Sequence, residues 1–200
     1  MKSHAFALGL TAALLATAAC NKTGNANENS TGQTPAAQKA AGTKTIAAGL
    51  PPGSRFVAAA KAAGLDRTLA GPGPYTVFVP DDAAFDKAPA GTFDTTPANR
   101  PQLTSVLTNL VLPGTVLVAD IDKAIDNGGG KTVLATMGGG TISATKQGGK
   151  TVLADSKGDK ATITNGDELY TNGVVHEVDA VLLPAKPAKG PAVGQKAGRR

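Results

Sequence analysis

Residues 173–184, GVVHEVDAVLLP, place a histidine inside an apolar run that has the pattern of a buried strand. An imidazole could serve there as a general base or a metal ligand, because it titrates nearest to neutral pH. A metal site needs two or three further ligands, and the only other histidine is His4, near the N-terminus. On an extended strand His176 lies on the more apolar face, opposite Glu177 and Asp179. We therefore predict a buried, hydrogen-bonded structural histidine.

Three other short patterns could carry chemistry, and each has a simpler explanation. NGGGKT at 127–132 is weakly similar to a phosphate-binding loop, but the first glycine of that loop falls on Ile125 and a strand-like segment follows it. The acids of 119–126 are not spaced as a calcium loop, so they indicate a solvated helix face. KGD at 157–159 is a tripeptide that integrin receptors bind, and a turn between strands explains it. The sequence also lacks GxSxG, CxxC and paired catalytic carboxylates, so we expect no enzyme, no metal and no cofactor.

Residues 1–20, MKSHAFALGLTAALLATAAC, have the plan of a secretory signal, with Lys2 followed by an apolar stretch too short to span a membrane. TAAC at its end resembles the bacterial lipobox, in which the cysteine is lipidated, although Thr17 stands where leucine is usual. In the other interpretation, ordinary cleavage after Ala18 leaves Cys20 as a free thiol. Cys20 is the only cysteine, and an exposed thiol is a liability in an exported chain. We therefore predict that Cys20 is lipidated and anchors the chain without spanning the membrane.

The flanks differ in composition from the middle of the chain. Residues 21–44 have no hydrophobic periodicity, which predicts a flexible linker, and residues 185–200 form a disordered basic tail rich in Pro, Ala, Gly and Lys. The net charge is +5, but residues 45–184 hold 11 basic and 14 acidic side chains. The positive charge therefore lies in the flanks, and a mildly acidic middle argues against nucleic-acid binding. The tail could touch an anionic envelope polymer, and a solvated, solubilising tail is the simpler interpretation.

The middle of the chain carries helix signals first and strand signals later. Ser54 and either Asp81 or Asp82 can cap helices. Helices are expected at 55–65, 66–70, 83–88, 101–111 and 119–126, and the clearest apolar stripe consists of Leu103, Val106, Leu107, Leu110 and Val111. Strands are expected at 75–80, 131–137, 141–146, 150–155, 160–165 and 173–184, mostly separated by glycine turns. This order indicates an α+β fold with an antiparallel sheet or sandwich and several helices in the N-terminal half.

Three segments together resemble the fasciclin domain family. YTVFVPDDAAFDKAP (75–89) is similar to its first signature block, LTNLVLPGTV (107–116) to the helix and Pro-Gly exit that follow, and TNGVVHEVDAVLLP (171–184) to its second block. The resemblance spans residues 45–184 and implies a twisted β-sandwich or wedge in which the histidine of the second block is structural. The signature residues of this chain are Thr76, Phe78, Pro80, Asp82, Phe85, Asn172, Gly173, His176 and Asp179.

The same resemblance implies adhesion or binding of matrix and surface components outside the cell. Many adhesive members carry a Tyr-His pair before the Pro-Gly exit, and here Thr108 and Asn109 stand in those positions. Integrin-type recognition through that pair is therefore not expected. The candidate binding face lies at the end of the helix before Gly114, and its residues are Leu107, Thr108, Asn109, Leu110, Val111 and Pro113.

The leading hypothesis is a non-enzymatic, lipid-anchored envelope protein that displays one domain to a surface or matrix polymer or to another protein. Asn21 and Lys22 after the cysteine, without an Asp, resemble lipoproteins sent to the outer membrane. We expect a monomer. The alternative hypothesis is a periplasmic carrier of a small apolar ligand, which requires an interior cavity beside His176. A hydrolase is the third hypothesis, and it lacks a nucleophile, a base and oxyanion donors.

Overall fold

The computed structural model describes residues 42–185; the expected signal segment, the linker up to residue 41 and the tail from residue 186 lie outside them. The helices are α2 (Ile46–Gly49), α3 (Arg55–Ala63), α4 (Asp66–Ala70), α5 (Asp82–Lys87), a 3₁₀ turn η1 (Pro97–Asn99), α6 (Arg100–Asn109) and α7 (Val118–Asn127). The strands are β1 (Tyr75–Pro80), β2 (Val111–Pro113), β3 (Lys131–Ala135), β4 (Thr141–Gln147), β5 (Lys150–Ala154), β6 (Lys160–Tyr170) and β7 (Gly173–Val178). The α+β class is confirmed.

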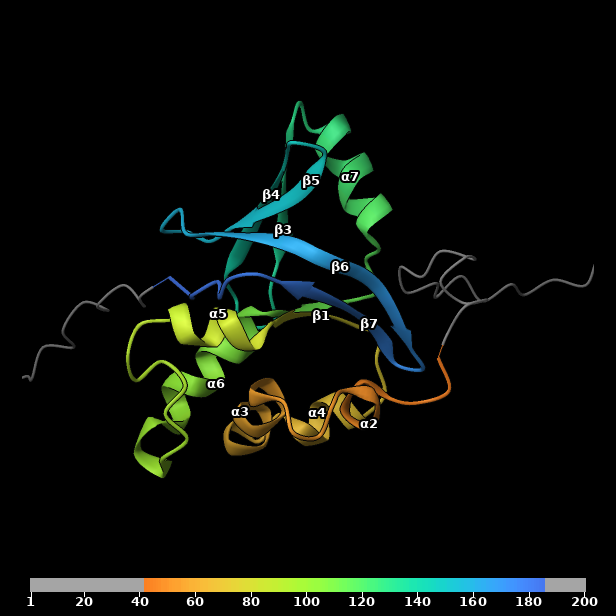
Figure 1. The fold of residues 1–200 in the computed structure, drawn as a ribbon. Helices are drawn as coiled ribbons and strands as arrows, with labels where there is room; N and C mark the ends of the chain where they lie inside the picture. The colour runs from red at the N-terminus through yellow and green to blue at the C-terminus, as the bar shows by residue number, and fades with distance from the viewer. Residues whose placement is uncertain (1–41, 186–200) are drawn as a thin grey trace, which may run out of the picture. The chain divides into compact units, whose positions relative to one another are not determined.

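All seven strands join one strongly twisted sheet in the order β2-β1-β7-β6-β5-β4-β3 (Figure 1). The prediction of an antiparallel sheet is wrong at one pair, because β1 and β7 run parallel and pair from Tyr75 with Gly173 to Pro80 with Val178. β7 is the last strand, and it inserts between the first strand and β6. Side-chain periodicity reports which face of a strand is buried, and it carries no information about the direction of the neighbour.

The helices cover the two halves of the sheet differently. In Figure 1, α2, α3, α4 and α6 lie on one side of the half formed by β1 and β7, and α7 lies against β3, β4 and β5. The core between these layers includes Ile46, Phe56, Phe78, Leu107 and Leu182. Strand β6 pairs with both β5 and β7 and carries register shifts around Asn165, which is where the two halves of the sheet diverge. The expected wedge is confirmed.

Local signals place the helix starts. The Ser54 hydroxyl accepts a hydrogen bond from the N–H of Val57 at 3.3 Å, and the Asp81 carboxylate accepts one from Ala84 at 2.6 Å. Of the two candidate caps, the structure uses Asp81, and Asp82 is the first residue of α5. Such caps satisfy N–H groups that have no partner within the helix.

The apolar stripe of α6 is shorter than predicted. The helix ends at Asn109, and Val111 belongs to β2, where it pairs with Val77 of β1. The carbonyl of Leu110 accepts a hydrogen bond from the N–H of Phe78 at 2.9 Å. The spacing i, i+3, i+4, i+7, i+8 therefore crosses a helix–strand junction, because both elements bury their apolar side chains in the same core.

The last predicted strand is also shorter. Strand β7 stops at Val178, although Leu182 is fully buried. At Asp179 the side chain replaces the backbone as the acceptor, because its carboxylate takes the N–H of Thr162 at 2.6 Å. Strand β6, in contrast, continues past Asn165 to Tyr170, through a polar stretch that lacks a strand-like pattern.

Candidate functional site

His176 lies in the middle of β7 and has no exposed surface. Its Nε2 is 2.8 Å from the carbonyl oxygen of Val116, and its Nδ1 accepts the backbone N–H of Asp167 at 3.0 Å. A carbonyl can only accept, so Nε2 carries the proton and the imidazole is neutral with both nitrogens satisfied. The Phe78 ring lies 5.6 Å away, centroid to centroid. The predicted buried, hydrogen-bonded histidine is confirmed.

Burial lowers the pKa of His176, and the hydrogen bond to Val116 and the carboxylate of Asp167 oppose this shift. Asp167 Oδ1 is 3.8 Å from Nδ1, but it is the Asp167 backbone that bonds the ring. The Nδ1 side of the ring is closely packed, because a Cβ built on Gly166 would come within 2.5 Å of Val118 Cγ2 and 3.6 Å of Nδ1, and none of the three pockets described below is lined by His176. The interior cavity that a carrier of an apolar ligand requires beside His176 therefore finds no support.

Thr76 hydrogen-bonds to Val116, the residue whose carbonyl accepts from His176. The Thr76 hydroxyl is buried, donates to the carbonyl of Gly114 at 2.8 Å and accepts the N–H of Val116 at the same distance. A single side chain thus satisfies one carbonyl and one N–H of the turn after β2. Thr76, Val116 and His176 form a connected polar chain across β1, the 114–116 turn and β7.

Asn172 is a second buried polar hub. Its amide nitrogen donates to the carbonyls of Leu69 and Gly71, and its Oδ1 accepts the N–H of Ile46, each at 2.8 Å. The side chain therefore ties α2 and the end of α4 to the start of β7. Gly173 follows at φ 152°, and a Cβ there would meet the carbonyl oxygen of Tyr75 at 1.9 Å. This close approach requires glycine.

Phe85 and Pro80 of the signature have packing positions, whereas Asp82 is exposed at the start of α5. Phe85 is buried, its ring lies 4.3 Å from that of Phe93, and the guanidinium of Arg55 sits 5.2 Å from its centroid. Arg55, at the start of α3, also forms an ion pair with the carboxylate of Asp86, which lies next to Phe85 in α5. Pro80 ends β1 and is buried. The signature thus forms the scaffold, and no pair of its side chains is arranged as a nucleophile and base.

The predicted binding face is corrected by the burial of its residues. Leu107, Asn109, Leu110 and Val111 are at most 3% exposed, so they cannot contact a partner. The Asn109 amide donates to the carbonyl of Leu182 at 3.3 Å and accepts from the hydroxyl of Thr136 at 3.4 Å. The Asn109 side chain therefore links the end of α6 to the 136–140 turn and to the segment that contains Leu182. Only two of the six predicted residues, Thr108 and Pro113, retain exposed surface.

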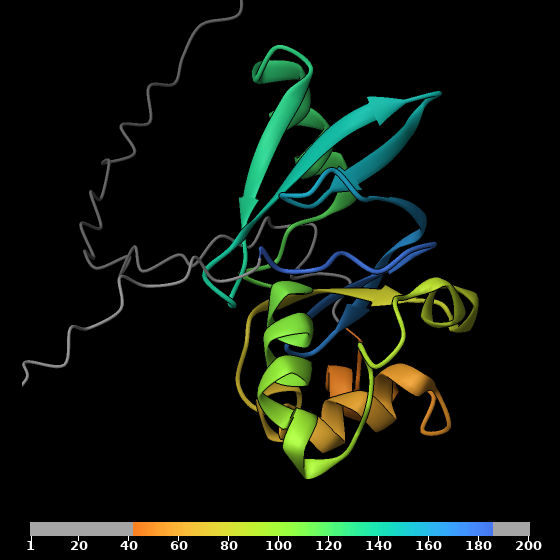
Figure 2. The same ribbon diagram turned by 90° about the vertical axis from the view of Figure 1, so that its left-hand side faces the viewer.

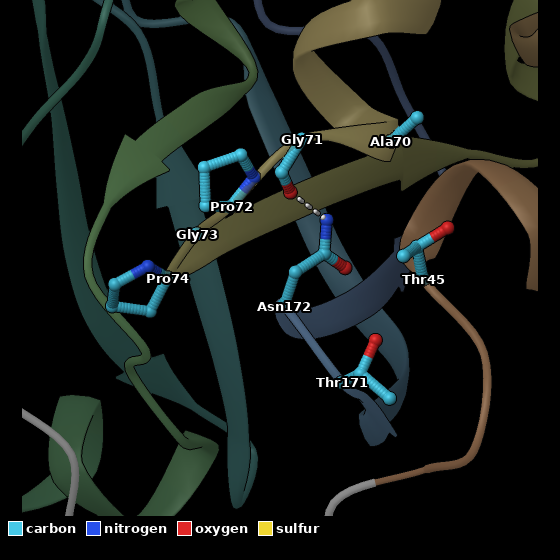
Figure 3. Close-up of a pocket in the computed structure, with 8 residues that line it drawn as sticks. All are labelled: Thr45, Ala70, Gly71, Pro72, Gly73, Pro74, Thr171 and Asn172. Carbon is cyan, nitrogen blue, oxygen red and sulfur yellow. Dashed lines mark hydrogen bonds between the residues drawn. The ribbon is translucent and has the colours of Figure 1, made fainter.

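A polar pocket of about 470 Å³ opens beside Asn172 (Figure 3). The loop 71–74, with sequence GPGP, forms one wall, and Thr45 and Thr171 stand on the other side. The Asn172 amide bonds the carbonyl of Gly71 and so fixes the distance between the walls. No charged side chain lines this pocket. No functional prediction fell on residues 71–74, and the only signal in the sequence was the run of two glycines and two prolines.

Two further pockets are smaller than the one beside Asn172. The one under α3, lined by Leu50, Phe56 and Leu69 among others, is apolar and holds about 60 Å³, which is room for one or two waters. The other, of about 290 Å³, lies between α5, the start of β6 and residues 180–183. Within residues 42–185, no three His, Cys, Asp or Glu side chains are grouped to hold a metal, and no helix is long and apolar enough to cross a membrane.

Comparison with known proteins shows which family shares this architecture. Residues 51–184 match the family described as Fasciclin domain. Protein sll1483 of Synechocystis sp. is 34% identical over 142 residues, which cover 70% of this chain and 71% of that protein. Uncharacterized protein sll1735 of the same organism is 35% identical over 132 residues, covering 65% and 88%. Immunogenic protein MPB70 of Mycobacterium bovis is 31% identical over 112 residues, covering 56% and 51%.

A solved structure shares the fold. The FAS1 domain pair from the insect cell adhesion molecule Fasciclin I aligns with a TM-score of 0.55 at 21% identity, over 70% of this chain and 51% of that one. The chain therefore spans about half the length of that solved chain, and the likeness concerns the fold alone.

Proposed function

Because the chain belongs to the fasciclin domain family, we propose that it is a non-enzymatic adhesion or binding protein of the bacterial cell envelope. Its domain contacts a surface or matrix polymer or another protein through a preformed face. Two observations support this proposal: Thr76, Asn172 and His176 of the family signature are engaged in structural hydrogen bonds, and a solved relative in fold is named as a cell adhesion molecule.

Anchoring by a lipid on Cys20 is part of the proposal. The signal-like segment that precedes Cys20 and the single cysteine of the chain support it. The residues after Cys20, Asn21 and Lys22, favour the outer membrane as the destination. In this arrangement residues 21–44 connect the lipid to the domain.

The polar pocket of Figure 3 is the contact site that best fits a surface polymer. Its walls offer the hydroxyls of Thr45 and Thr171 and the backbone of loop 71–74, without a charged group. Hydroxyls and carbonyls can exchange hydrogen bonds with a ligand that is itself rich in hydroxyls. An uncharged polysaccharide segment has this chemistry, and the rigid wall held by Asn172 reduces the ordering cost of binding.

The experiment is a pull-down of purified envelope polysaccharide by the full-length chain. A variant with Thr45→Val and Thr171→Val removes both hydroxyls at nearly constant volume, and Thr164→Val, at an exposed site of β6, is the matched control. We expect retention by the wild type and the control and loss of retention by the double variant, with equal melting temperatures. Equal retention by all three would place the contact elsewhere, and no retention by the wild type would refute polymer binding.

A further inference from the structure

The hydrogen-bond ladder between β6 and β7 opens at Asp179. Ile163 of β6 pairs with Val178, the last residue of β7, and in the same register Thr162 faces Asp179. The N–H of Asp179 donates to the carbonyl of Thr162 at 3.2 Å, but the N–H of Thr162 donates to the Asp179 side chain at 2.6 Å. The carboxylate thus takes the place of the backbone carbonyl as the acceptor, and the chain after β7 separates from β6.

The separation leaves the next backbone groups of this segment without partners. Continued in the same register, Lys160 would face Val181. Hydrogen-bonding pairs alternate along an antiparallel ladder, so these two residues would exchange N–H···O bonds. No such bond forms, and within residues 42–185 neither Ala180 nor Val181 donates its N–H to an acceptor. Both residues line the pocket of about 290 Å³, which is therefore a gap in the ladder that offers backbone donors.

Three segments of the chain meet around this pocket. The segment after β7 (blue) passes between the β5–β6 hairpin (cyan) and α5, as Figure 1 and Figure 2 show from two directions. Asp159 and Lys160 line the pocket at the start of β6, and Lys87 lines it at the end of α5. The rest of the lining is apolar and consists of Ala84, Ala88, Pro89, Ala180, Val181 and Leu183. The pocket thus combines apolar surface with three charged side chains.

A buried carboxylate fixes two sides of this pocket relative to each other. Asp155 Oδ1 accepts the N–H groups of Lys157 at 2.8 Å and of Asp159 at 3.0 Å. Its Oδ2 accepts the N–H of Leu183 at 3.1 Å. Asp155 therefore connects the turn before β6 to the segment after β7. A site that is held in place before the ligand arrives has a lower ordering cost on binding.

The charged groups of the lining determine which ligand fits. Lys87 and Lys160 carry two positive charges and Asp159 carries one negative charge, so the lining has a net charge of +1. Within residues 42–185 none of these three side chains forms an ion pair. Ammonium and backbone N–H groups only donate hydrogen bonds, and an ionised carboxylate only accepts them. A singly charged carboxylate therefore complements both the charge and the donors of the pocket.

We propose that this pocket binds a small organic monocarboxylate with a short apolar body. The carboxylate accepts hydrogen bonds from the lysine ammonium groups and from the N–H of Val181, and the apolar body lies against Ala84, Pro89 and Leu183. The volume of about 290 Å³ is near the lower end of the range for ligand pockets, so the ligand is small. The site shares no residue with the polar pocket beside Asn172 and does not depend on polymer binding there.

Titration with hexanoate tests the site. Hexanoate joins one carboxylate to a short alkyl chain, and hexanol has the same chain without the charge. The full-length chain is titrated with each probe at neutral pH and low salt, and the amide resonances of Ala180 and Val181 are followed by NMR. We expect hexanoate to shift both resonances and to saturate, and hexanol to bind roughly tenfold more weakly, because it lacks charge-assisted hydrogen bonds.

Three variants test the charged lining separately from the fold. The double variant Lys87→Met with Lys160→Met keeps side-chain length and should bind hexanoate roughly tenfold more weakly at an unchanged melting temperature. Lys123→Met with Lys150→Met, at two exposed positions outside the pocket, is the matched control and should bind as the wild type does. Asp159→Asn removes the opposing charge of the lining and should strengthen binding by about threefold.

Four results would overturn the proposal. The first is an absence of saturable hexanoate binding by the wild type. The second is equal affinity of the wild type and the variant that lacks both pocket lysines. The third is equal affinity for hexanol and hexanoate, because the pocket would then be an apolar cleft without charge selection. The fourth is an unchanged or lower affinity of Asp159→Asn for hexanoate.

Discussion

The Nε2–H of His176 donates to the carbonyl of Val116 over 2.8 Å and joins two segments that are 60 residues apart in the sequence. Val116 is itself held by the Thr76 hydroxyl, so the hydrogen bond links β7, the segment before α7 and β1. The histidine satisfies a carbonyl that would otherwise be buried without a partner in an apolar interior. The imidazole is thus a cross-link of the scaffold.

Replacement of His176 by Ala should destabilise the fold strongly. The change leaves the Val116 carbonyl and the Asp167 N–H without partners and opens a cavity, so we expect a loss of roughly 3 kcal/mol in the free energy of unfolding. Urea denaturation followed by circular dichroism measures this loss. Glu177→Ala, at the exposed neighbour on the same strand, is the control and should change stability by less than about 0.5 kcal/mol. Equal stability of the two variants would contradict the structural role.

Stability should fall as the pH is lowered from 7.5 to 5.5. The pKa of His176 is lowered by burial in the folded protein, so the unfolded chain binds a proton more readily below its ordinary pKa of 6.5. The unfolded state is therefore favoured by acid, by up to about 1.4 kcal/mol over this range. Unfolding free energies at several pH values measure the slope, and His176→Asn should flatten it. A slope that persists in that variant would assign the effect to other groups.

Asn172→Ala should cost about 3 kcal/mol in the free energy of unfolding, because it removes three hydrogen bonds, two of them buried, and takes the donor away from the Leu69 and Gly71 carbonyls. Thermal unfolding gives the comparison with Asn165→Ala, whose side chain is exposed on β6. Asn172→Ala should also widen the polar pocket, because the Asn172 amide hydrogen-bonds to the carbonyl of Gly71 in the facing wall. If Asn172→Ala melts at the same temperature as Asn165→Ala, the hub has been misidentified.

Gly173→Ala should prevent the parallel pairing of β1 with β7. The added Cβ would lie 1.9 Å from the Tyr75 carbonyl oxygen, and φ of 152° is unfavourable for any other residue. We expect more than about 3 kcal/mol of destabilisation or loss of soluble protein. Gly53→Ala is the control, since a Cβ there meets nothing within 4 Å. Normal folding of Gly173→Ala would show that the strands can separate without loss.

Cys20→Ser should release the protein from the membrane fraction. A lipidated cysteine anchors the chain, and the substitution removes the site of attachment. Fractionation of cells and the intact mass of the mature protein give the measurement, and Ser30→Ala in the linker is a control outside the lipobox. Wild-type protein found wholly in the aqueous fraction with an unmodified thiol would favour ordinary cleavage.

Several elements could be predicted from residue patterns because the relevant interactions are local. Ser54 caps α3 as expected, and the alternation of YTVFVP marks β1. The end of α6 could not be predicted, because Leu110 and Val111 continue the apolar stripe while the chain changes from helix to strand. The candidate binding face failed for a related reason. Asn109 is polar, which suggested exposure, but its partners Leu182 and Thr136 come from distant segments.

The sequence by itself determined the α+β class, the buried histidine, the turns and the likeness to the fasciclin family, because these depend on periodicity, turn chemistry and short ordered blocks. Only the tertiary structure decided that β1 and β7 run parallel, that GPGP forms one wall of a pocket beside Asn172, and that β3 lies at the edge of the sheet. These features depend on which distant segments become neighbours, and the pairing of strands far apart in the chain leaves no periodic trace in either strand.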